Sequence, residues 1–520
     1  MTVDFVMAAL LLPALTLAGE NAARTFYVDS AHGDDGASGL APDQAWRSLE
    51  KVNSAELQPG DTVRLACGGQ WRGSLVPQSG EEGRPITYTS YGPGEKPLLL
   101  GSAERSRAED WELVEPGVWA THAPAFHDAG LLLDCRRGEW SAYHEPDADA
   151  TLTRTDGEQG FLWRLQCRQS GRATNSIQLW GPFAEWADVA DAKYVTFRFR
   201  ARSSQPFAFE ALRAARGTSP WTTYARSSGR WQIGPEWQEY AVRMEIVGQG
   251  EQPRLHLSLG GQLPAGASFE LEPLELVRTE CLESTLLSVD VGNIIYDHGQ
   301  ACGWKKWSLD QLTNPLDYWY DGSTWRVYVR SQRNPGEVYQ SVELALNRHI
   351  VNQSAVHHVV YDGLALRYGA AHGFGGGGTH HLVIRNCDLA YIGGGHQFTA
   401  ADGRPVRFGN GIEFWGAAHD NLVEGCRLSQ VYDAALTNQG RGPTSKQLDI
   451  TYRNNLITNS EYSFEYWNNP ETAETRHILF ENNTCVDAGV VWSHAQRPNP
   501  NGSHLMLYTN TAQSEGIVIR

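Results

Sequence analysis

The segment Ile450-Thr-Tyr-Arg-Asn-Asn-Leu456 has two counterparts in the chain, and the three together predict the fold. They are Leu422-Val-Glu-Gly-Cys-Arg-Leu428 and Ile478-Leu-Phe-Glu-Asn-Asn-Thr484, and the opening positions 422, 450 and 478 are equally spaced. All three alternate apolar and polar residues and carry Gly or Asn at the corresponding turn. An equal period of this kind is typical of stacked strand-and-turn units. We therefore expect successive coils whose strands pair in parallel.

A second repeat lies on other strands of the same coils. Residues 411–415 and 463–467 both read small, apolar, Glu, aromatic, Trp. Thr437, Glu465 and Ser493 each lie at the same distance after the opening residue of their segment. With side chains alternating across each strand, this register predicts two outward columns. The first column holds Glu413, Thr437 and Glu465, and the second holds Trp415, Gln439 and Trp467. Carboxylates beside tryptophans on one ridge predict a sugar site.

Further coils fit the pattern more loosely. Residues 359–364 and 382–387 read as earlier strands, and residues 516–520 begin another strand, inside which the sequence stops. An open end without a polar cap leads us to expect that the sequence is a fragment of a longer protein.

The first hundred residues carry a resemblance to a known class. Residues 25–30 predict a strand, residues 46–53 a short helix, and residues 57–65, with Pro59-Gly60-Asp61, another strand. This order resembles the N-terminal cap of secreted right-handed parallel β-helix proteins of the pectate-lyase-like class. The resemblance implies an all-β protein, a right-handed parallel β-helix whose cap and first coils occupy residues 24–134.

From residue 135 to about 279 the pattern changes to short alternating strands separated by turns, which predicts an inserted β-sandwich. Residues 194–202, 220–224 and 237–240 resemble jelly-roll carbohydrate-binding modules. Five aromatic residues are candidates for a sugar-stacking surface, with core packing as the alternative for each: Trp180, Trp186, Trp221, Tyr224 and Trp231.

We expect the coils to resume at about residue 280 and to carry the active-site groove through residue 520. Residues 289–298, 369–373, 410–416 and 493–498 look like a group of exported bacterial β-helix proteins associated with polysaccharide breakdown. This resemblance implies a fold and a substrate class, without a defined activity.

Composition narrows the partners. The chain of 520 residues has 43 Lys and Arg against 60 Asp and Glu, a formal net charge of −17 that repels nucleic acid and other polyanions. Its 41% hydrophobic content excludes disorder, and 18 tryptophans suit a neutral or weakly charged glycan.

The N-terminus predicts export. Residues 6–18 form an apolar run followed by small residues, as in a secretory signal peptide spanning residues 1–23. The run is shorter than the roughly 20 residues that a bilayer requires. A secreted or periplasmic location is therefore expected, with no membrane segment elsewhere. Of the eight cysteines, Cys387, Cys426 and Cys485 fall on repeat strands and are expected to be free thiols rather than metal ligands.

Glu413 and Glu465 are the leading catalytic candidates. Two strand spacings separate them, about 9.6 Å, close to the roughly 6.5 to 9.5 Å between the carboxyl groups of inverting glycosidases. In the alternative reading both are surface ladder residues that balance arginines. Asp433 either forms a closer pair with one of them or caps a turn. His494 either orients a carboxylate, serves as a general acid or is simply hydrogen-bonded.

The remaining candidates are assigned to substrate binding. Trp415 and Trp467 would stack on sugar rings, Asn438 and Gln439 would bind hydroxyl groups, and His372 and Arg497 would approach the same groove. Residues 393–407 interrupt the repeat and form either a cleft wall or surface decoration.

Three functions follow. The first is an exported glycoside hydrolase acting on a plant or algal polysaccharide or its oligosaccharides, which needs no cofactor. The second is a polysaccharide lyase acting on a uronate, for which Arg407, Arg441, His494 and Arg497 could serve; Ca²⁺ would then be possible, although no acidic cluster has convincing Ca²⁺ spacing. The third is a non-catalytic glycan-binding protein.

Overall fold

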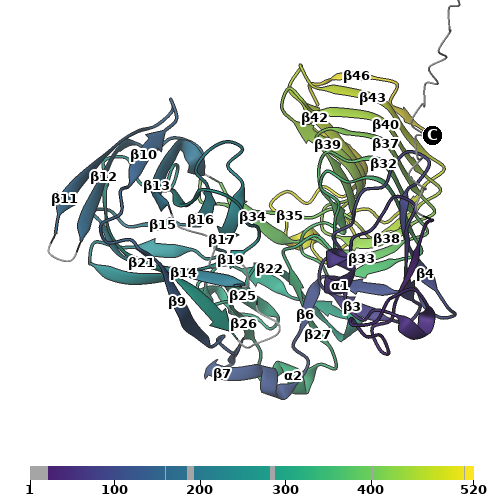
Figure 1. Cartoon of the computed structure of the whole chain (residues 1–520), viewed down its shortest axis with the longest axis horizontal. Helices are drawn as coiled ribbons and strands as arrows, with labels where there is room; N and C mark the ends of the chain where they lie inside the picture. Colours follow the sequence, from purple (N-terminus) through teal and green to yellow (C-terminus); the bar gives the residue numbers. More distant parts are fainter. Residues whose placement is uncertain (1–21, 158–159, 184–191, 282–286, 401, 509) are drawn as a thin grey trace, which may run out of the picture.

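The computed structural model describes residues 22–157, 160–183, 192–281, 287–400, 402–508 and 510–520. Almost all of the predicted signal peptide therefore lies outside the described residues, and so does Trp186. The described chain is predominantly β-strand and forms two bodies, one of stacked parallel strands and one of antiparallel strands, shown on the right and left of Figure 1.

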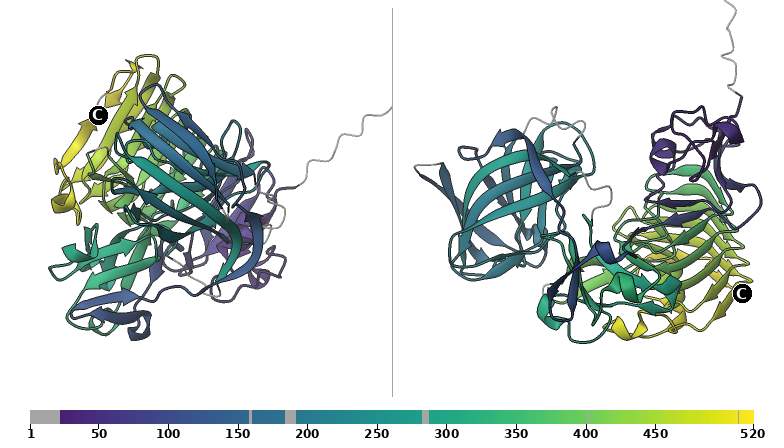
Figure 2. Two further views of the ribbon diagram at one scale, coloured as in Figure 1. Left: turned by 90° about the vertical axis from the view of Figure 1, so that its left-hand side faces the viewer. Right: turned by 90° about the horizontal axis from the view of Figure 1, so that it is seen from below.

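Three parallel sheets make up the first body. The right-hand view of Figure 2 shows its strands stacked one above the other. The first sheet contains β1 (Thr25–Val28), β2 (Thr62–Ala66), β4 (Ile86–Tyr91), β29 (His357–Asp362), β32 (His380–Arg385), β37 (Ala418–Glu424), β40 (Lys446–Arg453), β43 (Glu474–Glu481), β46 (Gln513–Glu515) and β47 (Val518–Ile519). The second contains β3 (Gln70–Arg72), β5 (Leu98–Leu100), β30 (Ala365–Arg367), β33 (Asp388–Ile392), β38 (Arg427–Val431), β41 (Leu456–Thr458) and β44 (Thr484–Val486). The third contains β28 (Val351–Asn352), β31 (Phe374–Gly375), β36 (Ile412–Trp415), β39 (Ala434–Arg441), β42 (Tyr462–Asn469) and β45 (Ser503–Leu507).

The chain visits these sheets in a fixed cycle. From β36 in the third sheet it passes to β37 in the first, β38 in the second and β39 in the third again. Inward side chains from all three sheets meet in one apolar core, in which Phe414, Tyr452 and Phe464 contact one another in series. The expectation of successive units with parallel pairing is confirmed.

The prediction of equal spacing between the three segments is confirmed for the step from residue 450 to residue 478 and is wrong for the step that starts at residue 422. Ile450 pairs with Ile478, as predicted, but Leu422 pairs with Thr451, so the earlier step is one position longer. The turns explain why the three segments carry Gly or Asn at the same position. Gly425, Asn454 and Asn482 all adopt positive φ at the same place in successive coils.

The predicted position of Ser493 is also wrong. Glu465 pairs with Met506 of β45, which therefore continues the column. The chain between β44 and β45 is longer than the repeat allows and includes the 3₁₀ helix η7 (His494–Gln496), which displaces Ser493 from the sheet.

The stack is interrupted by a long excursion. β4 pairs directly with β29, and β5 with β30, although the second strand of each pair follows the whole excursion in the sequence. Most of this excursion forms an eleven-stranded antiparallel sheet with its own apolar core. Its strands are β9 (Phe126–Asp134), β10 (Ser141–His144), β11 (Asp149–Asp156), β12 (Phe161–Gln169), β13 (Ile177–Phe183), β14 (Tyr194–Ser203), β16 (Ala211–Arg216), β17 (Thr223–Arg226), β19 (Gln238–Ile246), β20 (Pro253–Ser258) and β21 (Ser268–Cys281), with β15 (Phe207–Phe209) and β18 (Trp231–Ile233) paired beside it.

The coils do not resume at about residue 280, because β22 pairs antiparallel with β27. Two small sheets intervene before the third parallel sheet begins at β28. One contains β6 (Ser102–Glu104), β22 (Val291–Tyr296), β23 (Ala301–Cys302) and β27 (Val342–Leu346). The other contains β7 (Trp111–Glu115), β8 (Val118–Thr121), β24 (Trp304–Lys306), β25 (Asp317–Asp321) and β26 (Arg326–Arg330).

Helices are short and few among the described residues. The helix α1 (Leu49–Ser54) lies at the start of the stack, where Ser48 caps its N-terminus and Leu49 and Val52 enter the core. The others are α2 (Pro335–Val338), η1 (Pro42–Gln44), η2 (Ala108–Asp110), η3 (Thr174–Ser176), η5 (Asp297–Gly299) and η6 (Leu309–Gln311). None of the helices in the described part is both long and apolar enough to cross a bilayer. All eight cysteines are free, and Cys387 and Cys426 are buried as expected.

Candidate active site

Three neighbouring strands of the third sheet position the predicted carboxylates. Glu413 on β36 pairs with Thr437 on β39, which pairs in turn with Glu465 on β42. The same pairing aligns Trp415, Gln439 and Trp467. Both predicted columns are therefore confirmed, because parallel strands in register place equivalent side chains one above the other.

Glu413 is buried and held by two neutral donors. The Nδ2 of Asn410 donates to its Oε2 at 2.6 Å, and the Nε2 of His372 lies 3.3 Å from its Oε1. The backbone N–H of Asn410 donates to the Nδ1 of His372, so the proton of the neutral ring is on Nε2 and faces Glu413. Burial lowers the pKa of His372 to about 3. His372 thus lies beside the site as predicted, but as a partner of Glu413.

Burial also controls the ionisation of Glu413. It raises the pKa of this carboxyl to about 7; the Asn410 hydrogen bond lowers it and the nearby Asp433 raises it. A glutamic acid with this pKa is largely protonated below neutral pH and can donate a proton.

Glu465 has a similar environment with one oxygen uncommitted. The Nε2 of Gln439 donates to its Oε2 at 2.6 Å, so Gln439 is already engaged. The Oε1 of Glu465 accepts no hydrogen bond within the described part of the chain. Burial raises the pKa of Glu465 well above its usual range, and the charges of Asp433 and Glu413 raise it further.

Asp433 is the third carboxyl of the group, and it pairs with a cation. The Nη2 of Arg497 lies 3.1 Å from its Oδ1. Burial raises the pKa of Asp433, whereas Arg497 acts in the opposite direction. The same ion pair, opposed by burial, raises the pKa of Arg497. The side chain of Asp433 therefore forms an ion pair with Arg497 and does not cap a turn.

A fourth acidic residue, Glu461, was missed by the sequence analysis. It is fully buried, and His494 of η7 contributes Nδ1 at 2.9 Å from its Oε2. The side chain of His494 therefore contacts Glu461 and none of the three predicted carboxylates. No pattern singled out Glu461, because a polar residue just before a strand is ordinary.

The aromatic column is partly open to solvent. The rings of Trp415 and Trp467 meet edge to face with centroids 5.5 Å apart, and Trp415 is 37% exposed. Trp415 therefore offers an accessible apolar surface next to the carboxyl column.

Asn438 was wrongly assigned to substrate binding. It pairs with Phe414 and Tyr466 on the inner face of the coil, it is fully buried, and its Nδ2 donates to the Oε1 of Gln447 at 2.6 Å. Strand alternation sends Asn438 inward when Gln439 points outward.

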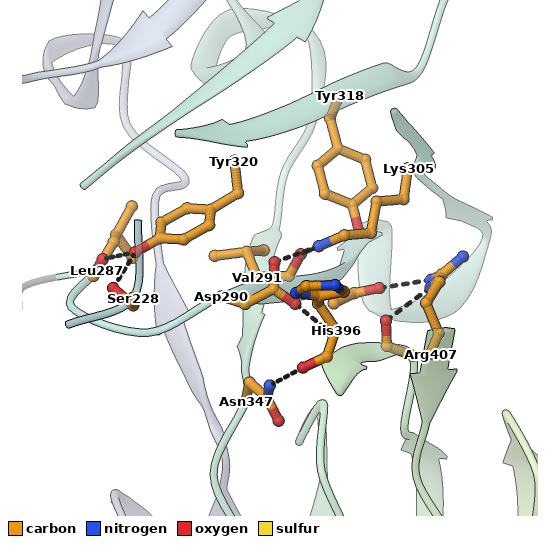
Figure 3. A network of polar contacts seen from close by, with 12 residues as sticks. Ser228, Leu287, Asp290, Val291, Lys305, Tyr318, Tyr320, Asn347, His396 and Arg407 are labelled. Atoms are coloured by element: carbon orange, nitrogen blue, oxygen red, sulfur yellow. Dashed lines mark hydrogen bonds and ion pairs between the residues drawn. The ribbon is translucent and has the colours of Figure 1, made fainter. Parts of the chain in front are cut away.

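The insertion predicted at residues 393–407 is a hairpin of β34 (Gly395–Thr399) and β35 (Pro405–Phe408). Asp290 anchors its base by accepting the backbone N–H of His396 at 2.7 Å, while also pairing with the buried Lys305 (Figure 3). Burial lowers the pKa of Lys305 to about 8, and Asp290 opposes this. Arg407 donates to the carbonyls of Gly394 and Gly292.

The tip of the hairpin reaches the antiparallel body. The Oγ1 of Thr399 donates to Glu210 at 2.8 Å, and a cavity of about 450 Å³ lies at this junction. Glu210 and Arg230 line it from one side, and Phe398 and Thr399 from the other. Of the two readings of this segment, the structure favours a cleft wall.

Most of the aromatic candidates on the antiparallel body are core residues. Trp180, Tyr224 and Trp231 are buried, and the Tyr224 hydroxyl donates to the carbonyl of Glu251. Trp221 is 49% exposed and packs beside Trp180 with ring centroids 5.5 Å apart. Trp221, supported by the buried Trp180, therefore remains as an exposed candidate for sugar stacking.

Comparisons with known proteins give one short sequence match and several distant structural similarities. No family model matches it. A stretch of 93 residues, 17% of this chain, is 33% identical to a lacto-N-biosidase of Bifidobacterium longum subsp. longum, and the match spans only 6% of that protein.

Solved structures are similar at low identity. XylC in complex with xylose is 10% identical, with a TM-score of 0.38, over 95% of this chain and 67% of that chain. The GH136 lacto-N-biosidase of Eubacterium ramulus is 10% identical, with a TM-score of 0.27, over 95% and 68%. A CBM4 structure is 14% identical, with a TM-score of 0.22, over 27% and 86%.

Proposed function

We propose that this protein is an exported glycoside hydrolase built on a right-handed parallel β-helix. The cyclic passage through three parallel sheets supports the fold. One observation carries the functional proposal: three carboxyl groups, those of Glu413, Asp433 and Glu465, lie close to an exposed tryptophan. Burial raises the pKa of each of these carboxyls. Carboxyl groups in unequal environments are the means by which glycosidases supply an acid and a base at one site.

The contacts of each carboxyl suggest its role. Asp433 alone among the three has a guanidinium partner, so it is the one that ionises most readily. Glu465 has a raised pKa and an uncommitted Oε1, which suits a proton donor. In this proposal Asp433 takes a proton from water, the water oxygen bonds to the anomeric carbon, and Glu465 protonates the departing glycosidic oxygen as its bond to that carbon breaks.

Glu413 has a supporting role in this scheme. Both of its oxygens are engaged, by Asn410 and by His372. Asn410 also accepts the backbone N–H of Ala434 at 3.0 Å, which ties Glu413 to the residue that follows Asp433. We propose that Glu413, when ionised, raises the proton affinity of Glu465 through its charge.

Substrate binding is assigned to three surfaces. Trp415 stacks on a sugar ring at the carboxyl column, the cavity at the hairpin tip holds remote sugar units, and Trp221 contributes a separate binding surface on the antiparallel body. The name of the matched lacto-N-biosidase makes oligosaccharides ending in lacto-N-biose the first substrates to test.

The lyase alternative receives less support. A lyase needs a cation to neutralise a uronate carboxylate; Arg407 is bonded to backbone carbonyls and Arg497 to Asp433, which leaves the exposed Arg441 for this role. His494, its candidate base, is paired with Glu461. The non-catalytic alternative does not explain why three carboxyl groups with raised pKa values lie together.

The proposal is tested on a panel of oligosaccharides and polysaccharides, following new reducing ends and the absorbance of unsaturated products. We expect reducing ends without absorbance. Glu465→Gln and Asp433→Asn should each lower kcat by about 10²- to 10⁴-fold, the range for lost acid–base catalysis, while Gln513→Glu on the edge strand β46 should not. Unsaturated products would show that the reaction is elimination and not hydrolysis. If no substrate gives any product, the glycan-binding alternative would be favoured.

A further inference from the structure

A row of imidazoles lies on the outer face of the first parallel sheet, away from the proposed hydrolytic residues. Its members occupy the first two residues of β29 and β32 and the second and third residues of β37. They are His357, His358, His380, His381, His419 and Asp420. The pairing of His357 with His380, and of His380 with His419, aligns them across three successive coils.

The backbone explains why two neighbouring side chains point outward on each strand. His358, His381 and Asp420 all have positive φ, between 53° and 54°. This conformation breaks the alternation of a regular strand, and the residues that follow, Val359 and Leu382, return to the core. Each coil therefore presents two adjacent polar side chains instead of one.

The rings are tightly arranged. His380 stacks on His357 and on His419 with centroids 4.7 Å apart in both cases, and His358 stacks on His381 at 4.5 Å. Within a coil, the Nδ1 atoms of His380 and His381 lie 3.0 Å apart. Six ring or carboxylate groups are thus concentrated on a small surface.

Two sets of three potential ligand atoms occur within this row. His358, His380 and His381 form one, and His381, His419 and Asp420 form the other; in each, the ligand atoms all lie within 4.8 Å of one another. Tetrahedral Zn²⁺ with bonds of about 2.0 to 2.1 Å requires ligand atoms roughly 3.4 Å apart. The proposal requires side-chain rotations that bring the ligand atoms of one set closer together by about 1 Å.

We propose that this histidine row binds one divalent transition-metal ion, of the Zn²⁺ type, with His381 common to both possible ligand sets. Imidazole with a carboxylate is a donor set that suits Zn²⁺ and disfavours Ca²⁺, which takes oxygen ligands. The site is separate from the proposed hydrolytic chemistry and does not depend on it.

The test is calorimetric titration of the tag-free, chelator-treated protein with ZnCl₂ at pH 7.5, and separately with CaCl₂. We expect about one Zn²⁺ per chain and no heat from Ca²⁺. His381→Asn should weaken Zn²⁺ binding at least about tenfold, since Asn tolerates positive φ and the fold is kept. The matched control is His477→Asn, because His477 has φ of 53° on the same sheet but pairs with Asp449.

A second readout separates binding from folding. Zn²⁺ should raise the thermal unfolding temperature of the wild type and of His477→Asn, and not that of His381→Asn, which removes the residue common to both ligand sets. Circular dichroism establishes that each variant is folded. No saturable binding of Zn²⁺ by the wild type, or equal affinity in His381→Asn and His477→Asn, would overturn the proposal.

Discussion

The Nη2 of Arg497 lies 3.1 Å from the Oδ1 of Asp433, a residue 64 positions earlier in the chain. Arg497 follows η7, in the segment that departs from the regular repeat, and it also donates to the carbonyl of Tyr432 at 2.8 Å. The irregular segment thus supplies the cation that sets the charge of the carboxyl group.

Removing this cation should change the pH dependence of hydrolysis. In Arg497→Met the pKa of Asp433 rises, because burial is no longer opposed, so a higher pH is needed to ionise the base. The acid limb of kcat/KM against pH should move upward, measured on an oligosaccharide substrate. Arg333→Met, at an exposed arginine away from the site, is the control; an unmoved limb in Arg497→Met would remove Asp433 from the role of base.

Glu413 should make the folded protein less stable at high pH. Its folded pKa of about 7 exceeds its ordinary 4.5, so the folded state binds the proton more tightly than the unfolded state. Its stabilising contribution is therefore full below pH 4.5 and is lost as the pH rises through 7, at a cost of about 3 kcal/mol.

Glu413→Gln should abolish this fall in stability. Urea unfolding at pH 5 and pH 8 should show a smaller loss of unfolding free energy in Glu413→Gln than in the wild type, by about 1 to 3 kcal/mol. Glu337→Gln, at an exposed glutamate of α2, should behave like the wild type. Identical pH dependence in Glu413→Gln and the wild type would show that Glu413 is ionised normally.

A buried asparagine ladder should stabilise the coils. The Oδ1 of Asn455 accepts the backbone N–H of Cys426 at 2.9 Å, and its Nδ2 donates to Asn483 at 3.0 Å. Asn455→Ala leaves buried groups unsatisfied and should lower the unfolding free energy by about 2 kcal/mol. Leu456→Ala, at a side chain that is 40% exposed, should cost less in the same urea titration. Equal costs would show that the hydrogen bonds of Asn455 contribute no more than an exposed side chain.

Trp221 should matter for glycan binding and not for cleavage of small substrates. Trp221→Ala removes an exposed ring and should weaken retention on insoluble polysaccharide several-fold, while kcat/KM for a short oligosaccharide stays the same. Tyr224→Phe, which loses only a hydroxyl bonded within the core, serves as the control in the same pull-down. Unchanged retention in Trp221→Ala would exclude this surface as a binding site.

The columns at the candidate site were predictable because parallel pairing converts a repeat into vertical neighbours. Glu413, Thr437 and Glu465 needed only the recurring Glu-aromatic-Trp pattern. The inward position of Asn438 follows from the same alternation, so its assignment to the surface was avoidable. The register of Leu422 was wrong by a single position, because apolar residues on both faces of β37 fit either pairing.

The histidine row left a weak signal in the sequence. His-His recurs at residues 357–358 and 380–381, and His-Asp at 419–420, but the steps between them differ in length. Unequal loops concealed a spatial repeat that strand pairing restores.

The sequence by itself determined the β-rich composition, the parallel stacking of the C-terminal strands and which glutamates share a column, because side-chain alternation and coil length are local properties. Only the tertiary structure decided that the excursion from the stack is wider than the predicted sandwich, running over residues 101–350 between paired strands, and that Arg497 reaches Asp433. It also decided that Glu461 and His494 pair. These contacts join segments whose separation depends on how whole sheets close around the core, which no local pattern encodes.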